Sequence, residues 1–433
     1  MRLSPRVSGH RGAITRGQAP GLCARKMDAM PHDKVKTAAR QRMAATGEAY
    51  TEARRMVIAE QGAQTGSPLF PEPDVTRDGP LGWVEPSVSF LLESTRPVAV
   101  AGRMNVNAWY SRFPDREGKF GARLKSHRGA DHEVALDELL LHERLAQKAK
   151  VSYEENGAGP DFRLYSDGRH VGAVEVMSLF MEQGWSEVQA RHGRIADELN
   201  RRLALDRWFI YFDVVQLDRD PSAKALTEWA SETMEELPDP SKSGIREHHR
   251  TYTAKGVRLS FTFAACKPDP GGPRGRIVGP GPVIGGFVKS GDRLRTALQK
   301  KAGNRYDLRD SPFAICVGAH DPFCSLDQVE AALYGNVQYE VATMSRSRAQ
   351  NGFFGRRPGE PEGRNTRISC VFVLSNWHPW EPEKARLIRL DNPFAARRFP
   401  EELLAVDAQV ARVDHGDGRF SFEWLPARPT DTW

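Results

Sequence analysis

The sequence predicts an α/β protein in which helices flank a mixed central sheet. From residue 131 onward, segments with helical spacing of apolar residues alternate with short strand-like apolar runs. Such an alternation favours a sheet that helices cover on both faces. The composition agrees with a globular chain: 39% of the 433 residues are hydrophobic and 27% are charged. A chain of this length can bury a large core.

The N-terminal part predicts a different organisation. Residues 1–32 are basic and lack an apolar stretch of the kind that signal peptides carry, so we expect a disordered extension. Residues 33–61 predict a basic helical hairpin that breaks at Gly47, where a glycine suits a helix end. The hairpin could bind DNA, but a docking element with a solvated polar face is the commoner use of such helices. Residues 62–80 are rich in Gly, Pro and polar residues and predict a linker.

The remainder, residues 81–433, is expected to form one α/β domain with an insertion around 185–290. Apolar spacing predicts its elements in a definite order. They are a helix at 131–149, strands at 150–154, 161–166 and 171–180, a helix at 186–203, a strand at 208–217, a helix at 223–237, a strand at 257–264, a helix at 290–306, a strand at 311–319, a helix at 326–335 and a strand at 367–375.

Charge and cysteine content restrict the partners and the compartment. The net charge of +6 permits a polyanionic partner without requiring one. Five scattered cysteines argue against a disulfide framework and favour a reducing, cytoplasmic location. No run approaches the roughly 20 apolar residues of a membrane span. Cys316, His320 and Cys324 lie close in sequence, but a zinc site needs a fourth ligand, and Cys316 sits in an apolar run typical of a core cysteine.

Two carboxylates lie where adjacent strands would bring them together. Asp161 begins one predicted strand and Glu175 lies inside the next, and Asp167-Gly168 between them suits a tight hairpin turn. Because side chains alternate along a strand, Glu175 and Met177 should share one face. Magnesium prefers one or two carboxylates with water, so this hairpin predicts a metal site. The structural alternatives are that Asp161 caps a turn and that Glu175 pairs with a structural arginine or lies on an exposed edge.

With Glu138 in the preceding helix, the pattern Pro160-Asp161 and Glu175-x-Met177 resembles the PD-(D/E)XK (restriction endonuclease-like) nuclease superfamily. That family has a helix, a three-stranded meander, a second helix and a fourth strand. The resemblance implies that Glu138, Asp161 and Glu175 bind Mg²⁺ or Mn²⁺ for hydrolysis of nucleic acid. The chain departs from the pattern at Met177, where the family carries the lysine that assists the attacking water.

A replacement amine is available on the predicted helix at 290–306. Lys301 follows Leu298 by three residues, which puts it on the apolar stripe of that helix, whereas Lys300 points more to the side. Lys301 is therefore the candidate catalytic amine, and the alternative is a lysine whose stem packs while its ammonium reaches water. Glu143, five residues after Glu138, cannot face the same site as Glu138 and is an alternative ligand.

A loop near residue 360 combines arginines with two phenylalanines, a mixture that suits phosphate and base contact. Its candidate nucleic-acid-binding residues are Arg356, Arg357, Arg364 and Arg367. A charged loop ordered by its own phenylalanines is the alternative. The sequence thus supports two functional hypotheses, a magnesium-dependent nuclease and a catalytically inactive nucleic-acid- or protein-binding module on the same fold.

Overall fold

The structure is a computed structural model of the chain. It describes residues 37, 40–44, 47, 50, 68–73, 77, 81–115, 117–154, 159–203, 207–239, 246–266, 277–281, 289–303, 306, 308, 311–340, 345–356, 362–414 and 420–425.

The chain divides into two compact units, Met1–Gly66 and Ser67–Trp433. In the first unit the described residues 37, 40–44 and 50 are helical. The predicted N-terminal extension and the rest of the predicted hairpin lie outside the described residues. The second unit begins before the predicted end of the linker at residue 80. Phe70 is only 1% exposed, and its backbone N–H and C=O bond to the side-chain amide of Asn107, each at 2.8 Å.

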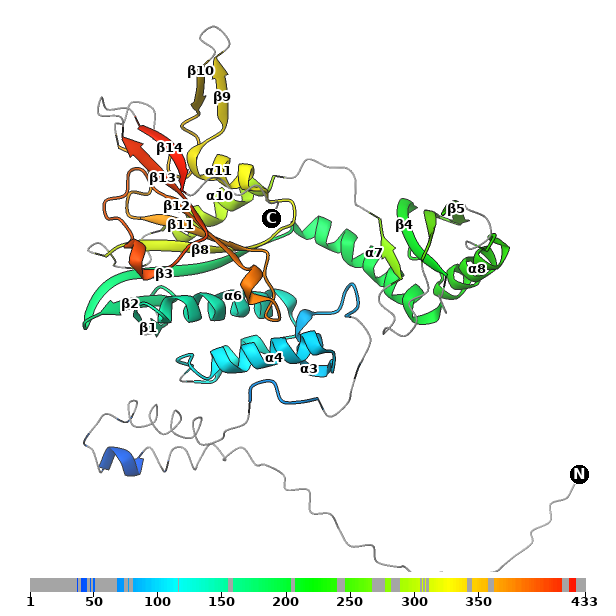
Figure 1. The fold of residues 1–433 in the computed structure, drawn as a ribbon, viewed down its shortest axis with the longest axis horizontal. Helices are drawn as coiled ribbons and strands as arrows, with labels where there is room; N and C mark the ends of the chain where they lie inside the picture. The colour runs from blue at the N-terminus through cyan, green and yellow to red at the C-terminus, as the bar shows by residue number, and fades with distance from the viewer. Residues whose placement is uncertain are drawn as a thin grey trace, which may run out of the picture. The chain divides into compact units, whose positions relative to one another are not determined.

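An eight-stranded mixed sheet forms the centre of the second unit, in the order β1-β2-β3-β8-β11-β12-β13-β14 (Figure 1). Its strands are β1 (Lys150–Tyr153), β2 (Phe162–Ser166), β3 (Arg169–Phe180), β8 (Phe313–His320), β11 (Cys370–Ser375), β12 (Arg386–Asp391), β13 (Ala408–Asp414) and β14 (Phe420–Leu425). Strands β1, β2 and β3 form an antiparallel meander, and β3, β8 and β11 run parallel. The prediction of a mixed sheet flanked by helices is confirmed.

Two layers of helices cover this sheet. On one side lie α3 (Ser87–Glu93), α4 (Pro97–Tyr110), α5 (Lys119–Leu124) and α6 (Gly129–Ala146), and on the other lie α10 (Ser290–Lys301) and α11 (Leu326–Tyr334) (Figure 1). Strand β3 contributes to both layers because its side chains alternate. Val174 and Val176 join the core cluster of α6, while Ala173 and Met177 join the cluster of α10.

The segment between β3 and α10, where the insertion was predicted, has a core of its own. Its elements are α7 (Gln183–Arg202), β4 (Trp208–Leu217), α8 (Ala223–Glu236), β5 (Glu247–Ala254), β6 (Val257–Ala265) and β7 (Val278–Pro280). The strands form a separate sheet in the order β5-β6-β4-β7, with Phe212, Phe261 and Phe263 buried beneath the two helices. A small hairpin, β9 (Val337–Glu340) and β10 (Ser345–Arg348), and two 3-10 turns, η2 (Pro382–Lys384) and η3 (Glu401–Leu403), complete the unit.

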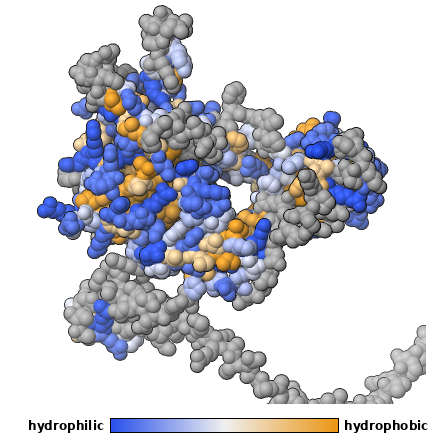
Figure 2. Space-filling view, viewed as in Figure 1, coloured by the Kyte–Doolittle hydropathy of each residue, from blue (hydrophilic) through white to orange (hydrophobic). Residues whose placement is uncertain are grey.

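Apolar side chains gather on the surface over α3 and α4 (Figure 2). Val98, Val100 and Met104 of α4 are 44%, 39% and 67% exposed. Such patches on otherwise polar surfaces commonly mark contacts. None of the helices in the described ranges has the length and apolar character of a bilayer-crossing segment.

Candidate functional site

The β2–β3 hairpin brings Asp161 beside Glu175. The turn uses Asp167 and Gly168, both with positive φ (49° and 75°), as the sequence predicts for a two-residue hairpin loop. Phe162 pairs with Val174 in the antiparallel register, so the preceding Asp161 lies opposite Glu175. Asp161 precedes the first residue of β2, and its Oδ2 accepts a hydrogen bond of 2.6 Å from the backbone N–H of Val176.

Glu175 is a buried carboxylate with one occupied oxygen. The residue is 2% exposed, and its Oε1 accepts hydrogen bonds from the Lys301 ammonium at 2.5 Å and from the Tyr306 hydroxyl at 3.1 Å. Its Oε2 is buried without a hydrogen-bond partner in the structure. A buried charge is costly unless it is paired, so the Lys301 contact compensates much of the burial of Glu175.

Lys301 reaches Glu175 from the last turn of α10. Leu294 and Leu298 of this helix are buried, and the lysine follows on the same stripe. Its side chain remains 34% exposed, so Lys301 is only partly buried. Met177, which stands at the position of the family's lysine, is 8% exposed and packs in the same cluster as the α10 leucines. The amine beside Glu175 thus comes from α10 and not from β3.

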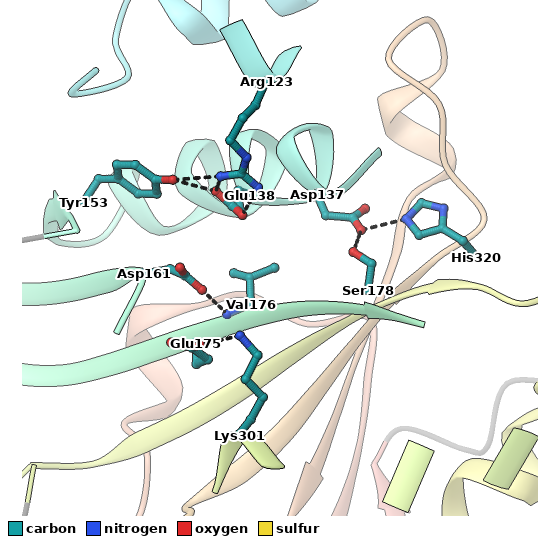
Figure 3. Close-up of polar contacts among 10 residues, drawn as sticks. All are labelled: Arg123, Asp137, Glu138, Tyr153, Asp161, Glu175, Val176, Ser178, Lys301 and His320. Carbon is teal, nitrogen blue, oxygen red and sulfur yellow. Dashed lines mark hydrogen bonds and ion pairs between the residues drawn. The ribbon is translucent and has the colours of Figure 1, made fainter. Parts of the chain in front are cut away.

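Asp161 lies between two other carboxylates. Figure 3 shows Asp161 between Glu175 and the carboxylate of Glu138. Burial raises the pKa of Asp161 to about 8, with further contributions from the charges of Glu138 and Glu175, while the Val176 N–H and Lys301 oppose the shift. A carboxyl group with such a pKa can hold or release a proton near neutral pH, as functional carboxyl groups often do.

Glu138 has both of its carboxylate oxygens occupied. It is 3% exposed on α6 and forms a two-point pair with Arg123 of α5, at 2.7 and 2.9 Å. The Tyr153 hydroxyl donates a third bond of 2.9 Å to the same carboxylate (Figure 3). Burial raises the pKa of Glu138, and Arg123 opposes that rise. The alternative ligand Glu143 instead pairs with Arg112 at 2.6 Å on the surface.

Of the three predicted carboxylate ligands, Glu138 is the one with both oxygen atoms bound to Arg123. In the described part of the chain, no three His, Cys, Asp or Glu side chains are arranged to hold a metal. Glu138 is committed to Arg123, but Asp161 and the unpartnered Oε2 of Glu175 offer hard oxygen atoms on neighbouring strands. Mg²⁺ commonly binds one or two carboxylates and takes its remaining ligands from water and substrate phosphates.

Another buried carboxylate, Asp137, lies near the carboxyl ends of the parallel strands. It is fully buried and accepts bonds from Ser178 at 2.7 Å, His320 at 2.7 Å and Trp377 at 3.1 Å. Gly318 leaves room for it, since a Cβ there would lie 1.8 Å from Asp137 Oδ2. In this network the aspartate stands between serine and histidine, so the histidine cannot activate the serine as in a hydrolase triad.

The Asp137 group was not predicted from the sequence. The available signal was a second acidic residue, next to Glu138, within the apolar stretch of the helix at 131–149.

The interpretation of Cys316 as a core cysteine agrees with the structure. Cys316 is buried in the core cluster of α6 and Cys324 in the cluster of α10, on opposite faces of the sheet.

The candidate arginines separate into different environments. Arg367 donates to the backbone carbonyls of Ala302 at 2.9 Å and Tyr306 at 3.4 Å, and therefore stabilises the C-terminal end of α10. Arg356 and Arg364 line a cavity together with Arg295 and Gln299 of α10. Arg357 lies outside the described residues.

Comparison of the chain with protein-family models, with characterised proteins and with solved structures finds no match.

Proposed function

We propose that the protein hydrolyses phosphodiester bonds of nucleic acid with the aid of Mg²⁺ or Mn²⁺, at a site formed by Asp161, Glu175 and Lys301. The observation that carries the proposal is the 2.5 Å contact between Lys301 and Glu175. A lysine beside the second acidic residue is what the PD-(D/E)XK pattern requires and what Met177 fails to supply. Here α10 supplies it.

The order of elements supports the same proposal. Helix α6, the β1–β2–β3 meander, α10 and β8 occur in the order that the resemblance implies, and β8 pairs in parallel with β3. Glu175 and Lys301 then meet between this meander and the second helix. The segment that contains α7, α8 and the four-stranded sheet is an insertion before the second helix.

In this proposal the residues have distinct roles. A divalent cation held by Asp161 and Glu175 would polarise the phosphate and lower the pKa of a bound water. The Lys301 ammonium has three donors, of which one binds Glu175. A second donor can hold a phosphate oxygen or orient a water for attack. Glu138, held by Arg123 and Tyr153, acts on Asp161 through its charge and not as a ligand.

The test is metal-dependent cleavage of plasmid DNA, single-stranded DNA and RNA by the wild type, with Glu175→Ala as the blank. We expect cleavage by the wild type and by Glu138→Gln, and none by the blank. Wild-type protein that matches the blank on all three substrates would contradict the proposal.

A second candidate is a catalytically inactive module that binds nucleic acid or protein. It is favoured by the absence of a three-ligand metal group among the described residues and by the neutralisation of Glu175 by Lys301. Under this hypothesis the wild type binds one of the three nucleic acids, or a protein, without cleaving any substrate, and divalent metal changes neither binding nor stability.

A further inference from the structure

An arginine-rich cavity of about 490 Å³ opens between α10 and the loop after β10. We call it the arginine cavity, and its lining residues are Arg295, Gln299, Gln350, Asn351, Arg356 and Arg364. The volume lies in the range of small-ligand sites. Among the described residues, three guanidinium groups and three amides line it, and no carboxylate does. The chemistry of the lining therefore selects an anion with several acceptor atoms.

The backbone of the loop brings two of the arginines together. Arg356 forms an antiparallel bridge with Gly363, and the N–H of Arg364 donates to the carbonyl of Gly355 at 2.9 Å. Gly363 is required because a Cβ at this position would lie 2.0 Å from the Phe394 ring. The same ring supports the Arg356 guanidinium at 4.8 Å. The Phe394 ring thus supports the Arg356 side chain, and backbone contacts hold Arg356 and Arg364 near each other before any ligand arrives.

The arginine cavity contains unsatisfied donors. The Nε atoms of Arg356 and Arg364 are buried without a hydrogen-bond partner in the structure. The third guanidinium, that of Arg295, pairs with Asp292 at 2.8 Å and donates to the Asn351 carbonyl at 3.1 Å. Buried donors are rarely left unpaired, and neighbouring cationic groups repel each other. An anion in the cavity would relieve the repulsion.

We propose that the arginine cavity binds the phosphate group of a phosphorylated ligand. A phosphomonoester carries about −1.5 to −2 charges at pH 7 and three acceptor oxygens. Guanidinium groups match phosphate with paired hydrogen bonds, and the amides of Gln299 and Gln350 can contact the rest of the ligand. The same chemistry suits a small phosphorylated molecule and a nucleic-acid strand. The inference goes beyond the proposed hydrolysis, because binding at this cavity requires no cleavage.

The test is calorimetric titration of the full-length chain without divalent metal. The probes are inorganic phosphate, a nucleoside monophosphate, and an oligodeoxynucleotide with a 5′-phosphate or a 5′-hydroxyl. Arg356→Gln and Arg364→Gln should each weaken phosphate binding roughly tenfold to a hundredfold, as loss of a charge-assisted hydrogen bond predicts. Arg258→Gln is the matched control, since Arg258 is an exposed arginine on β6 outside the cavity.

A further variant tests the proposal even if the arginine variants fail to fold. Gln299 is exposed on α10, so Gln299→Glu should fold normally while it adds a negative charge to the cavity. We expect it to weaken phosphate binding with all three arginines present.

The arms of the titration identify the ligand. If the cavity binds the monophosphate and the 5′-phosphorylated strand more tightly than the 5′-hydroxyl strand, its ligand is a terminal phosphate. If both strands bind equally well, its ligand is an internal phosphodiester. Either result supports the proposal. It is overturned if no probe binds, or if the cavity variants bind as well as Arg258→Gln. Lys301→Met should still bind phosphate at the arginine cavity. If this variant loses cleavage while it keeps phosphate binding, the result tests the proposed hydrolysis and leaves the proposed phosphate binding unaffected.

Discussion

The ammonium of Lys301 lies 2.5 Å from the Glu175 carboxylate, although the two residues are 126 positions apart in the chain. This contact joins the end of α10 to the middle of β3. It gives a 2% exposed carboxylate its only cationic partner among the described residues. The contact has consequences both for stability and for the proposed chemistry.

Lys301→Met should lower stability and activity together. Removal of one partner of a fully buried ion pair costs roughly 3–5 kcal/mol. Since the Lys301 side chain is 34% exposed, we expect a smaller loss of about 1–3 kcal/mol in urea unfolding. Lost acid–base help should reduce cleavage about 10²–10⁴-fold. Lys300→Met, one residue earlier and exposed, is the control and should change neither quantity. An unfolding free energy equal to that of the control would show that the pair does not stabilise the fold.

Met177→Lys should have opposite effects in two backgrounds. In the Lys301→Met protein, the new lysine shares the face of Glu175 and can replace the lost ammonium, so stability and cleavage should partly recover. In the wild type it would add a second buried ammonium beside Lys301 and should destabilise the fold. Urea unfolding of the four proteins in this cycle measures the coupling, and Met177→Leu controls for packing. Equal effects of Met177→Lys in both backgrounds would be incompatible with a direct role for Lys301 beside Glu175.

Metal binding should be visible as thermal stabilisation that depends on Asp161. A ligand that binds only the native state stabilises it by about 2.7 kcal/mol at 100 times its Kd. We therefore expect Mg²⁺ or Mn²⁺ at pH 8 to raise the melting temperature of the wild type and to leave Asp161→Asn unchanged. Metal-free buffer with EDTA sets the baseline. An equal rise in the variant would remove Asp161 from the set of ligands.

The raised pKa of Asp161 predicts a pH effect without metal. Its folded-state pKa, about 8, lies above the ordinary value of 3.8, so the native state binds more protons than the unfolded state between these values. Stability from this group is present below pH 3.8 and is lost as pH rises through 8. Asp161→Asn removes this titration. The free energy of unfolding of the variant minus that of the wild type should increase from pH 4 to pH 8, and a flat difference would contradict the assigned shift.

His320 predicts a second pH effect, at the Asp137 group. Burial lowers the pKa of His320, but the charge and the hydrogen bond of Asp137 outweigh burial, so the pKa is raised above 6.5. The stabilisation is therefore complete below pH 6.5 and is lost as pH rises through the folded-state pKa. The stability advantage of the wild type over His320→Gln should shrink with rising pH. An advantage that stays constant over this pH range would contradict the raised pKa of His320.

The sequence determined the elements and the faces of the candidate site. Apolar spacing predicts α6, β1–β3, α10 and β8, because burial of a periodic face is a local property of the chain. The Asp167-Gly168 turn pairs Ser166 with Arg169, and a register shift between Leu164 and Tyr165 then places Glu175 opposite Asp161. The stripe of α10 predicts that Lys301 faces inward. Helices α3–α5 and strands β5, β7, β9, β10 and β12–β14 were not predicted.

Only the tertiary structure decided which charge meets which. Glu138 and Asp137 are neighbours on α6, yet one pairs with Arg123 and Tyr153 while the other binds His320, 183 residues away. The sequence assigned Glu138 to a metal, and it assigned Arg367 to nucleic acid although this arginine binds the end of α10. Periodicity specifies the direction in which a side chain points, but its partner depends on long-range packing. Because a buried charge must be paired, that packing determines which carboxylates remain available for chemistry.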